Sequence, residues 1–470
     1  MFKKSYYKVL LCCLFCSLAS IGSMALPVSV DENVEFISAV CRIAGFREYI
    51  DNTNKAYAER IDSLMAPYKD HGAVEYFNKV GRNQGVGYDA VACLAVHTDI
   101  KDGHVVLKDG SDIALSDERW AEGQDKEIVA LLDDLYQRSN FAEFYKSNSG
   151  YYNQAIANMN KLLEDCDLRW LNDFYGKELS GSRVVVSLLN RGNYGMTQHL
   201  KGKPDESVII ISCNNVDEKG YPVFHGQNSL IIHESSHPVC NPLVGANLNK
   251  FNNNIFLASV LMDDELAQQS YSGGQTMMCE SMVRSMELQY ALAHDNTSAE
   301  RFMKDQMSRG FIFMPEIREA LDEYSKNREL YPVIDSIMPV IIDKINIVDV
   351  SKRYVEIKNG SPKIIGCSIA EGADCIEPSD SLEVRFFFDK PIQKGSFGMA
   401  YYKNNGDIMP QLADVSPKIR LSDDGMVLTA FFKTEAGKEY GFSMFGAFYR
   451  SLNGYKGHGK VDVHFYTKLQ

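Results

Sequence analysis

The hydrophobic pattern of the chain changes at residues 358–362, which read KNGSP. Before this point apolar residues recur at helical spacing, as in VEFISAVCRIAGFREY at residues 34–49. After it, short runs such as LEVRFFFD and EYGFSMFG alternate between apolar and polar residues, with Gly, Asp and Asn between the runs. The pattern predicts an α+β chain, in which a mainly helical domain at residues 26–355 precedes an all-β sandwich at residues 360–470.

The helical domain is itself expected in two parts, residues 30–180 and residues 181–350. In the first part, alternation around KDG at residues 104–115 predicts a hairpin. In the second part, the β-branched runs SRVVVSLL and SVIIISC predict strands at residues 182–189 and 207–213, before helices resume from about residue 250. Further helices of the first part are predicted at residues 56–68, 125–147 and 152–166.

The first 25 residues differ in kind from the rest of the chain. The basic stretch MFKKSYYK precedes the apolar run VLLCCLFCSLASIG, and Ser23, Met24 and Ala25 follow. This is the order of a secretory signal peptide, and the apolar run is too short for a membrane-spanning helix. We therefore expect a signal peptide at residues 1–25. The mature chain is expected to lack a transmembrane segment and to be exported to the periplasm, the cell surface or the extracellular space.

Charge and cysteine content exclude one class of partner and one class of site. The formal net charge is -13, and the sequence contains no basic stripe, so nucleic acid is not an expected partner. The mature chain has no CxxC pair, which excludes a cysteine-rich zinc site. Cys367 and Cys375 are close enough in sequence to form a disulfide across a turn, whereas free buried thiols are expected for the other cysteines.

Residues 233–237 read HESSH. On a helix, His233 and His237 lie one turn apart on the same face, so both imidazoles can reach one metal ion. Glu234 lies beside them, where it can accept a proton from an attacking water molecule. The same motif also arises by chance, as a pair of core histidines with a surface glutamate. A third ligand is therefore the deciding feature, because a catalytic zinc site has three protein ligands and an open position.

A third histidine at short range is excluded, because Leu243 stands ten residues after His233. A carboxylate on a later helix is the alternative. The stretch TMMCESMVRSMELQYALA at residues 276–293 is mostly apolar, yet it places three charged residues on one face, which indicates either a solvated stripe or a site. Those residues are Glu280, Arg284 and Glu287.

Glu280 is the favoured third ligand. Glu287 and the acidic run at residues 263–265 are the other candidates, and Arg284 is expected to pair with a carboxylate beside the metal rather than to touch substrate.

With these motifs the sequence resembles a known family. HESSHPVCNPL followed by CESMVRS is similar to the HExxHPxxNP and downstream ExxVR motifs of an uncharacterised bacterial family of secreted, gluzincin-like zinc metallopeptidases. Blocks such as LRWLNDFYG and GFIFMPEIREALDEYSKNRELYP extend the likeness over about residues 34–344. The resemblance implies a zincin-like domain with a small β-sheet, in which His233, His237 and Glu280 hold Zn²⁺ and Glu234 is the catalytic base. The C-terminal segment resembles a bacterial immunoglobulin-like module.

Residues close to the motif add expectations of their own. Pro238 follows the second histidine and lacks an N–H, so the helix is expected to kink or end there. Asn241, before a second proline, is a candidate hydrogen-bond partner of a ligand, or simply a turn residue. Four residues are candidates for the donor that stabilises the transition state, although each type is more often found in a core or a loop: His225, Tyr271, Tyr290 and His294.

Together these features predict a secreted zinc metallopeptidase that hydrolyses a peptide or protein substrate. The predicted strand at residues 182–189 or 207–213 is expected to bind the substrate backbone as an added strand. Two alternatives remain open. One is an adhesion or substrate-binding protein with a structural or vestigial metal site, and the other is a zinc hydrolase acting on a non-peptide amide or ester. The oligomeric state is not predicted.

Overall fold

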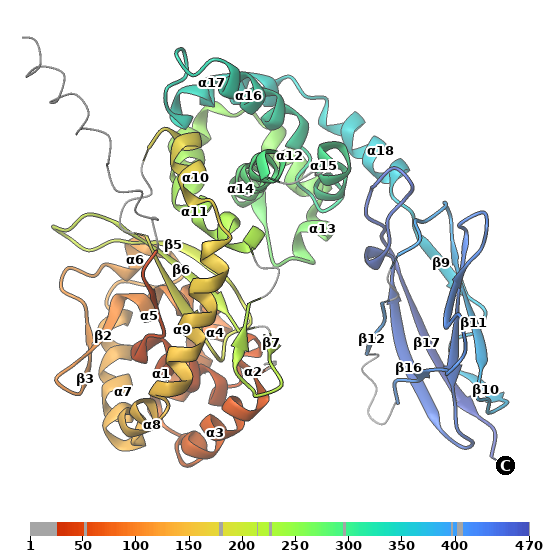
Figure 1. Cartoon of the computed structure of the whole chain (residues 1–470), viewed down its shortest axis with the longest axis horizontal. Coiled ribbons are helices and arrows are strands. Elements are labelled where there is room, and N and C mark those ends of the chain that lie inside the picture. Colours follow the sequence, from red (N-terminus) through yellow and green to blue (C-terminus); the bar gives the residue numbers. More distant parts are fainter. Residues whose placement is uncertain are drawn as a thin grey trace, which may run out of the picture. The chain divides into compact units, whose positions relative to one another are not determined.

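The computed structural model describes residues 26–50, 54–177, 182–213, 215–224, 228–294, 298–395, 398–401 and 408–469 (Figure 1). The predicted signal peptide lies outside these residues, and so does His225. The described chain is a mixture of helices and strands with more helix than strand, so the predicted α+β class is confirmed. None of its helices is both long and apolar enough to cross a membrane. Internal contacts divide the chain into two compact units, Met1–Pro238 and Val239–Gln470.

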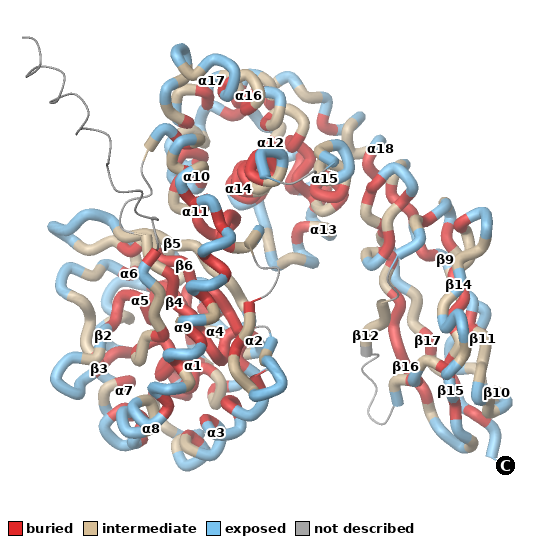
Figure 2. Tube along the Cα trace, viewed as in Figure 1, coloured by how far each residue is buried: buried red, intermediate tan, exposed pale blue. Residues whose placement is uncertain are grey.

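The first unit contains a four-stranded sheet with the strand order β1-β4-β6-β5. Its strands are β1 (Val28–Ser29), β4 (Arg183–Ser187), β5 (Tyr194–Gln198) and β6 (Glu206–Ser212). The neighbours β1, β4 and β6 run parallel, whereas β5 runs antiparallel to β6. The β-branched residues of β4 and β6 are buried, as Figure 2 shows in red. Both predicted strands are therefore confirmed.

The place of these two strands in the sheet corrects one prediction. β6 has neighbours along both sides, whereas β4 lies between β6 and the two-residue strand β1, which pairs only with Val184 and Val185. Residues 207–213 therefore offer no edge to a substrate backbone, and the expectation for residues 182–189 stays a prediction. Among the described strands, the edge next to β6 belongs to β5, which the sequence did not predict.

Helices surround this sheet. The amphipathic helices α1 and α9 contact β4, and α5 contacts β5. Aromatic side chains fill the space between the helices: Phe36 of α1 meets the rings of Tyr136 and Phe141 edge-on, both at 5.1 Å between centroids. The helices of this unit, other than those treated below, are α1 (Glu32–Ile43), α2 (Arg47–Ile50), α3 (Lys55–Met65), α4 (Gly72–Gln84), α5 (Asp89–His97), α7 (Gln124–Ser139), α8 (Phe141–Ser147), α9 (Ser149–Glu164) and α10 (Leu168–Tyr175).

The hairpin predicted at residues 104–115 is only half right. β3 (His104–Leu107) does belong to a hairpin, but its partner is the preceding strand β2 (Thr98–Lys101). The turn lies at Asp102 and Gly103, whose φ angles of 53° and 80° suit an Asp-Gly pair. After the KDG turn the chain forms the short helix α6 (Ile113–Ser116), because the Asp112 side chain accepts a hydrogen bond from the N–H of Leu115 and caps it.

The HESSH motif lies in α11 (Asn228–Asn247), a helix that continues through Pro238 and Pro242. The helix therefore does not end at Pro238, and the alternative expectation of a kink there stays a prediction. Each proline removes one N–H from the helical ladder, and the carbonyl that Pro238 leaves without its helical donor is that of Glu234. This carbonyl oxygen lies against Gly195 of β5, so closely that a Cβ atom at Gly195 would stand 2.1 Å from it.

The second unit begins with helices, which confirms the helical content predicted from residue 250 onwards. The central helix α14 is buried along most of its length, and it contacts α12, α15 and α16. The helices are α12 (Asn254–Leu261), α13 (Asp263–Ala267), α14 (Gly273–His294), α15 (Ala299–Met307), α16 (Met314–Lys326), α17 (Met338–Asn346) and α18 (Val350–Gly360).

The rest of the second unit is all-β. Two sheets, ordered β10-β17-β16-β12 and β13-β15-β11-β9, share a core that includes Phe386, Phe432, Phe442 and Phe465. The immunoglobulin-like topology and the domain boundary near residue 355 stay predictions. The strands are β9 (Ile364–Cys367), β10 (Ala373–Ile376), β11 (Leu382–Phe388), β12 (Ala400–Tyr401), β13 (Gln411–Leu412), β14 (Ile419–Leu421), β15 (Val427–Lys433), β16 (Glu439–Phe445) and β17 (Lys460–Thr467).

The disulfide expected between Cys367 and Cys375 is absent, because both residues are free cysteines. Cys367 lies in β9 and its thiol donates to the carbonyl of Ile369 at 2.8 Å. Cys375 lies in β10, which belongs to the other sheet, and it is exposed. Closeness in sequence did not bring the two sulfur atoms together, since the intervening turn carries the chain from one sheet to the other.

Candidate metal centre

The helical spacing of HESSH places its two imidazoles together. The Nε2 atoms of His233 and His237 lie 3.2 Å apart, and the two rings are nearly perpendicular at 76°. Glu234 lies on the same turns of helix, with its Oε2 atom 3.8 Å from Nε2 of His237. His233 and Glu234 are buried, with 8% and 5% of their surface exposed. The glutamate therefore does not lie on the surface, as the chance interpretation of the motif required.

A carboxylate completes this pair. One ligand atom from each of His233, His237 and Glu280 lies within 4.8 Å of the other two. Glu280 is 5% exposed. Ligands of a tetrahedral zinc ion, at about 2 Å from the metal, stand roughly 3.3 Å from one another. The two imidazoles already have this separation, and two histidines with one carboxylate are a donor set that suits zinc. The residues present therefore fit a metal ion of this kind.

Glu280 lies on a helix that buries several polar side chains. The hydroxyls of Ser281 and Ser285 donate to carbonyls of their own helix, each at 2.7 Å. Arg284, one turn after Glu280, brings its Nη2 atom to 3.3 Å from the Glu280 carboxylate. Arg284 therefore places a positive charge directly beside the carboxylate that would hold a metal.

Two contacts within the first unit fix the position of α11. Tyr175, the last residue of α10, donates a hydrogen bond of 2.7 Å to the hydroxyl of Ser236, which donates in turn to the carbonyl of Ile232 at 2.7 Å. The backbone of β5 approaches the carbonyl of Glu234 at Gly195, where no side chain would fit. Both contacts act on residues within the HESSH segment or directly before it, so they orient its side chains.

Among the described residues, the group of potential metal ligands does not include Glu287 or the acidic run at residues 263–265. Asn241 lies at an exposed position of α11, and Glu287 is half-buried on α14. In the acidic run, Glu265 forms an ion pair with Lys358. The roles of Asn241 and of the candidates for the transition-state donor stay predictions. Tyr290 stacks on His294 with ring centroids 4.1 Å apart, and Tyr271 meets Phe311.

Reasoning from the sequence missed strand β5. Its signal was a glycine within RGNYGMTQ, between the two predicted strands, where a close approach of another backbone excludes a side chain. The run lacks the β-branched residues that identified its neighbours, so periodicity alone could not find it.

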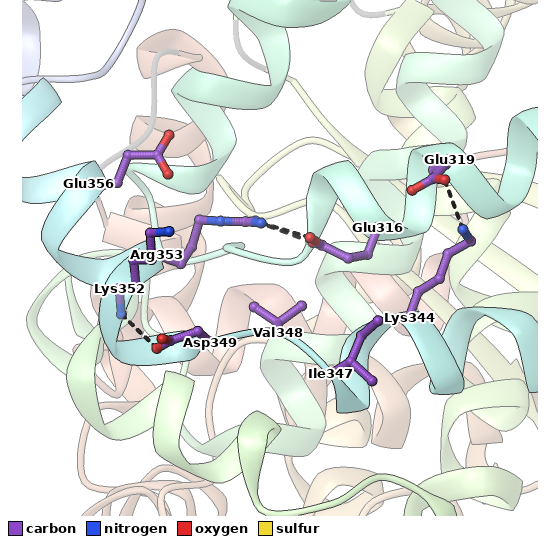
Figure 3. Close-up of a pocket in the computed structure, with 9 residues that line it drawn as sticks. All are labelled: Glu316, Glu319, Lys344, Ile347, Val348, Asp349, Lys352, Arg353 and Glu356. Atoms are coloured by element: carbon purple, nitrogen blue, oxygen red, sulfur yellow. Dashed lines mark hydrogen bonds and ion pairs between the residues drawn. The ribbon is translucent and has the colours of Figure 1, made fainter.

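A cavity of about 530 Å³ lies elsewhere in the second unit, on α16, α17 and the start of α18 (Figure 3). Its charged residues largely pair with one another. Lys344 contacts Glu319 at 2.9 Å, and Arg353 contacts Glu316 at 2.7 Å, while Asp349 caps its own helix. None of the predicted metal ligands lines it.

Comparisons with known proteins identify a family for the chain but do not indicate its activity. No protein of curated function matched it. Surface layer protein SbsC, in a structure of its domains 1–6, is 13% identical over 51% of this chain and 33% of that one, with a TM-score of 0.16. The N-terminal part of bacterial S-layer protein SbsC gives 12% identity over 52% and 58% of the two chains, with a TM-score of 0.17. This chain thus spans about a third of the longer SbsC structure, and scores this low carry no argument.

A family model does match most of the chain. The match covers residues 23–344, which include the HESSH motif and α14. The protein therefore belongs to the family described as domain of unknown function DUF4932.

Proposed function

We propose that this protein is a zinc metallopeptidase. The observation that carries the proposal is the convergence of His233, His237 and Glu280 beside a buried Glu234. Two histidines and a carboxylate provide three ligands, and a buried glutamate next to them provides a base. A purely structural site would need the ligands but would have no use for Glu234.

The residues divide the chemistry among them. A zinc ion bound by the three ligands supplies Lewis acidity, which polarises a carbonyl group and lowers the pKa of water. Glu234 accepts a proton from the attacking water and delivers it to the leaving amine. Arg284 does not touch the reacting atoms. It orients the Glu280 carboxylate by its contact of 3.3 Å.

Strand β5 is the proposed binding site for the substrate backbone. It is the edge strand next to β6, so its outer N–H and C=O groups can pair with an extended peptide. At Gly195 the strand passes directly beside the carbonyl of Glu234. A peptide added along β5 would therefore run past the catalytic glutamate.

Further proposals follow from the resemblance and the N-terminal sequence. They are a zincin-like fold for the matched region, an immunoglobulin-like fold for the C-terminal sheets, and export of the protein through an N-terminal signal peptide. An adhesion protein with a vestigial site, or a hydrolase of a non-peptide amide or ester, are the alternatives that the experiment must separate from a peptidase.

The test combines metal analysis with a search for cleavage. The purified protein is expected to bind about one zinc ion per chain, which His233→Ala and Glu280→Ala each lose. Glu287→Ala, a carboxylate on the same helix outside the group, is the matched control and should keep its zinc. The zinc-loaded protein is then incubated with a peptide library and the products are read by mass spectrometry.

Each result has a definite meaning. Zinc with cleavage supports the peptidase, whereas zinc without cleavage of any peptide favours a hydrolase of another bond. No zinc in the wild-type protein, even when zinc is supplied, would contradict the proposal and favour the adhesion alternative.

A further inference from the structure

Positively charged side chains gather around Asp305 of α15 in the second unit. The Asp305 carboxylate accepts a hydrogen bond from Nε of Arg309 at 2.9 Å and from Nε of Arg450 at 2.6 Å, one on each oxygen. Arg450 belongs to the segment that follows β16. One aspartate, almost fully buried, thus holds two guanidinium groups. Neither arginine makes a further side-chain hydrogen bond to the described residues, so their Nη donors remain available.

Arg284 connects this cluster to the candidate metal centre. Its Nη1 atom donates to Oε1 of Gln306 at 3.1 Å, and the Gln306 amide lies 3.5 Å from the Asp305 carboxylate. Its Nη2 atom lies 3.3 Å from Glu280. The Nε of Arg284 is buried and has no hydrogen-bond partner among the described residues. The Arg284 guanidinium also lies over the ring of Phe311, 4.3 Å from the ring centroid.

Lys456 is the fourth cation of the cluster, and its backbone is held firmly. Its N–H donates to the hydroxyl of Ser308 at 2.7 Å. The preceding Tyr455 is 5% exposed and donates to Glu356 at 3.1 Å. At the following Gly457, a Cβ atom would stand 2.4 Å from the carbonyl oxygen of Gly446. The loop between β16 and β17 therefore has little freedom, and it keeps the lysine beside α15.

The ammonium group of Lys456 has no use within the described structure. It makes no hydrogen bond and no ion pair there, because both oxygens of Asp305 already accept from arginines. Partial burial, and then the charge of Arg309, lower the pKa of Lys456 to about 8, although Asp305 acts in the opposite direction; Arg450 and Arg284 contribute further lowering. Such crowding of like charges is unfavourable, and a bound anion would relieve it.

The charge balance supports the same conclusion. Arg309 and Arg450 share the single carboxylate of Asp305, so these ion pairs leave a positive surplus. This local surplus contrasts with the formal net charge of -13 of the whole chain. The backbone of Lys456 helps to dock the loop on Ser308, but its ammonium group takes no part in that contact.

We propose that Lys456, together with Arg284, Arg309 and Arg450, binds a carboxylate group of the substrate. The inference rests on the proposed function, because a peptide carries such a group either on an acidic side chain or at its C-terminus. Guanidinium and ammonium groups match a carboxylate in charge and in hydrogen-bond geometry. The C-terminal segment would thereby contribute to substrate recognition through Arg450 and Lys456.

Binding of three acetylated tripeptides to the zinc-loaded protein tests this site. The first has glutamate in the middle and an amidated C-terminus, the second has glutamine there and the same amide, and the third has glutamine with a free C-terminal carboxylate. We expect at least one carboxylate peptide to bind about tenfold more tightly than the neutral one by calorimetry. Which of the two binds identifies the source of the carboxylate.

Variants assign the preference to the cluster. Lys456→Gln should remove it, Lys456→Arg should keep it, and Lys460→Gln, a matched control four residues further on, should leave it unchanged. Equal binding of all three peptides, or a preference that survives in Lys456→Gln, would overturn the inference. Because bound zinc is counted in the same samples, zinc without a preference contradicts only the carboxylate site. A preference without zinc supports the site and contradicts the metallopeptidase.

Discussion

Two buried glutamates, in different regions of the molecule, show opposite ways of placing a carboxylate in a protein interior. Glu35 lies in α1 of the first unit with none of its surface exposed, and it accepts from the N–H of Leu188 at 2.8 Å and the hydroxyl of Tyr57 at 2.9 Å. Glu280 lies in α14 with a guanidinium at 3.3 Å and two imidazoles close by.

The difference lies in the charge of the partners. Around Glu35 the donors are neutral, and burial raises the pKa of its carboxyl group to about 7 despite the hydrogen bonds. Such a residue ties α1 to the chain that follows β4, which is a structural task. Around Glu280 the neighbours can carry positive charge or bind a cation. The comparison teaches that burial alone does not indicate a site, and that the partners of the buried group decide its role.

The largest effect is expected at Glu234, the proposed base beside the metal ligands. Glu234→Gln should lower the rate of peptide cleavage by about 10³-fold, because the amide cannot accept the proton of the attacking water. Bound zinc should stay at the wild-type level, as metal analysis would show. Full activity in this variant would remove Glu234 from the mechanism. Glu287→Gln serves as the control and should be fully active.

Zinc should increase the stability of a variant at Glu35 but not that of a variant at Glu280. At a free zinc concentration about 1,000 times its Kd, binding to the folded state alone stabilises it by about 4 kcal/mol. We expect this gain in thermal unfolding of the wild type and of Glu35→Gln, but not of Glu280→Gln. The comparison fails if zinc stabilises Glu280→Gln as much as the wild type.

The pH dependence of stability should depend on Glu35. Its pKa is higher in the folded state, so the folded protein binds more protons than the unfolded one between pH 4.5 and about 7. The contribution of Glu35 to stability is thus fully present below pH 4.5, and about 3 kcal/mol of it is lost as the pH rises through 7.

Urea unfolding over this pH range provides the measurement. Glu35→Gln should be less sensitive to pH than the wild type by that amount, since a glutamine amide does not ionise. Glu143→Gln, an exposed position on α8, should follow the wild-type curve. A Glu35→Gln curve parallel to that of the wild type would show that Glu35 is not the group responsible.

The smallest effect should come from the contact between Gly195 and Glu234, which positions the HESSH segment. Gly195→Ala places a Cβ atom 2.1 Å from the carbonyl oxygen of Glu234, where both backbones would have to shift. We expect a loss of stability of about 2 kcal/mol in urea unfolding, with a loss of activity as well, because the shift displaces Glu234. Gly150→Ala, with no atom near the added Cβ, is the control. Unchanged activity in Gly195→Ala would show that the contact of β5 with Glu234 does not affect catalysis.

Elements with a strong local pattern were predicted well. The β-branched runs became β4 and β6, and the alternating runs LEVRFFFD and EYGFSMFG became β11 and β16. Elements that depend on a neighbouring strand were not predicted. β5 has a weak pattern and exists because β6 offers it an edge, and the strand that pairs with β3 turned out to precede it.

The prolines of α11 also show that a local rule can fail to predict an element. The local rule for proline predicts a break in α11 after His237, yet the helix continues to Asn247. The rule concerns one lost hydrogen bond, whereas the helix as a whole is held by the burial of residues such as Ile231, Ile232 and Val244. Packing outweighed the local cost.

The sequence by itself determined the α+β class and the adjacency of His233, Glu234 and His237, because helical periodicity fixes residues four apart on one face whatever surrounds them. Only the tertiary structure decided that Glu280, rather than Glu287 or the acidic run, joins the histidines. It also decided that Lys456 lies beside α15, some 150 positions earlier in the chain. The physical reason is that the charge and burial around a side chain depend on which elements pack together, and no local pattern encodes that.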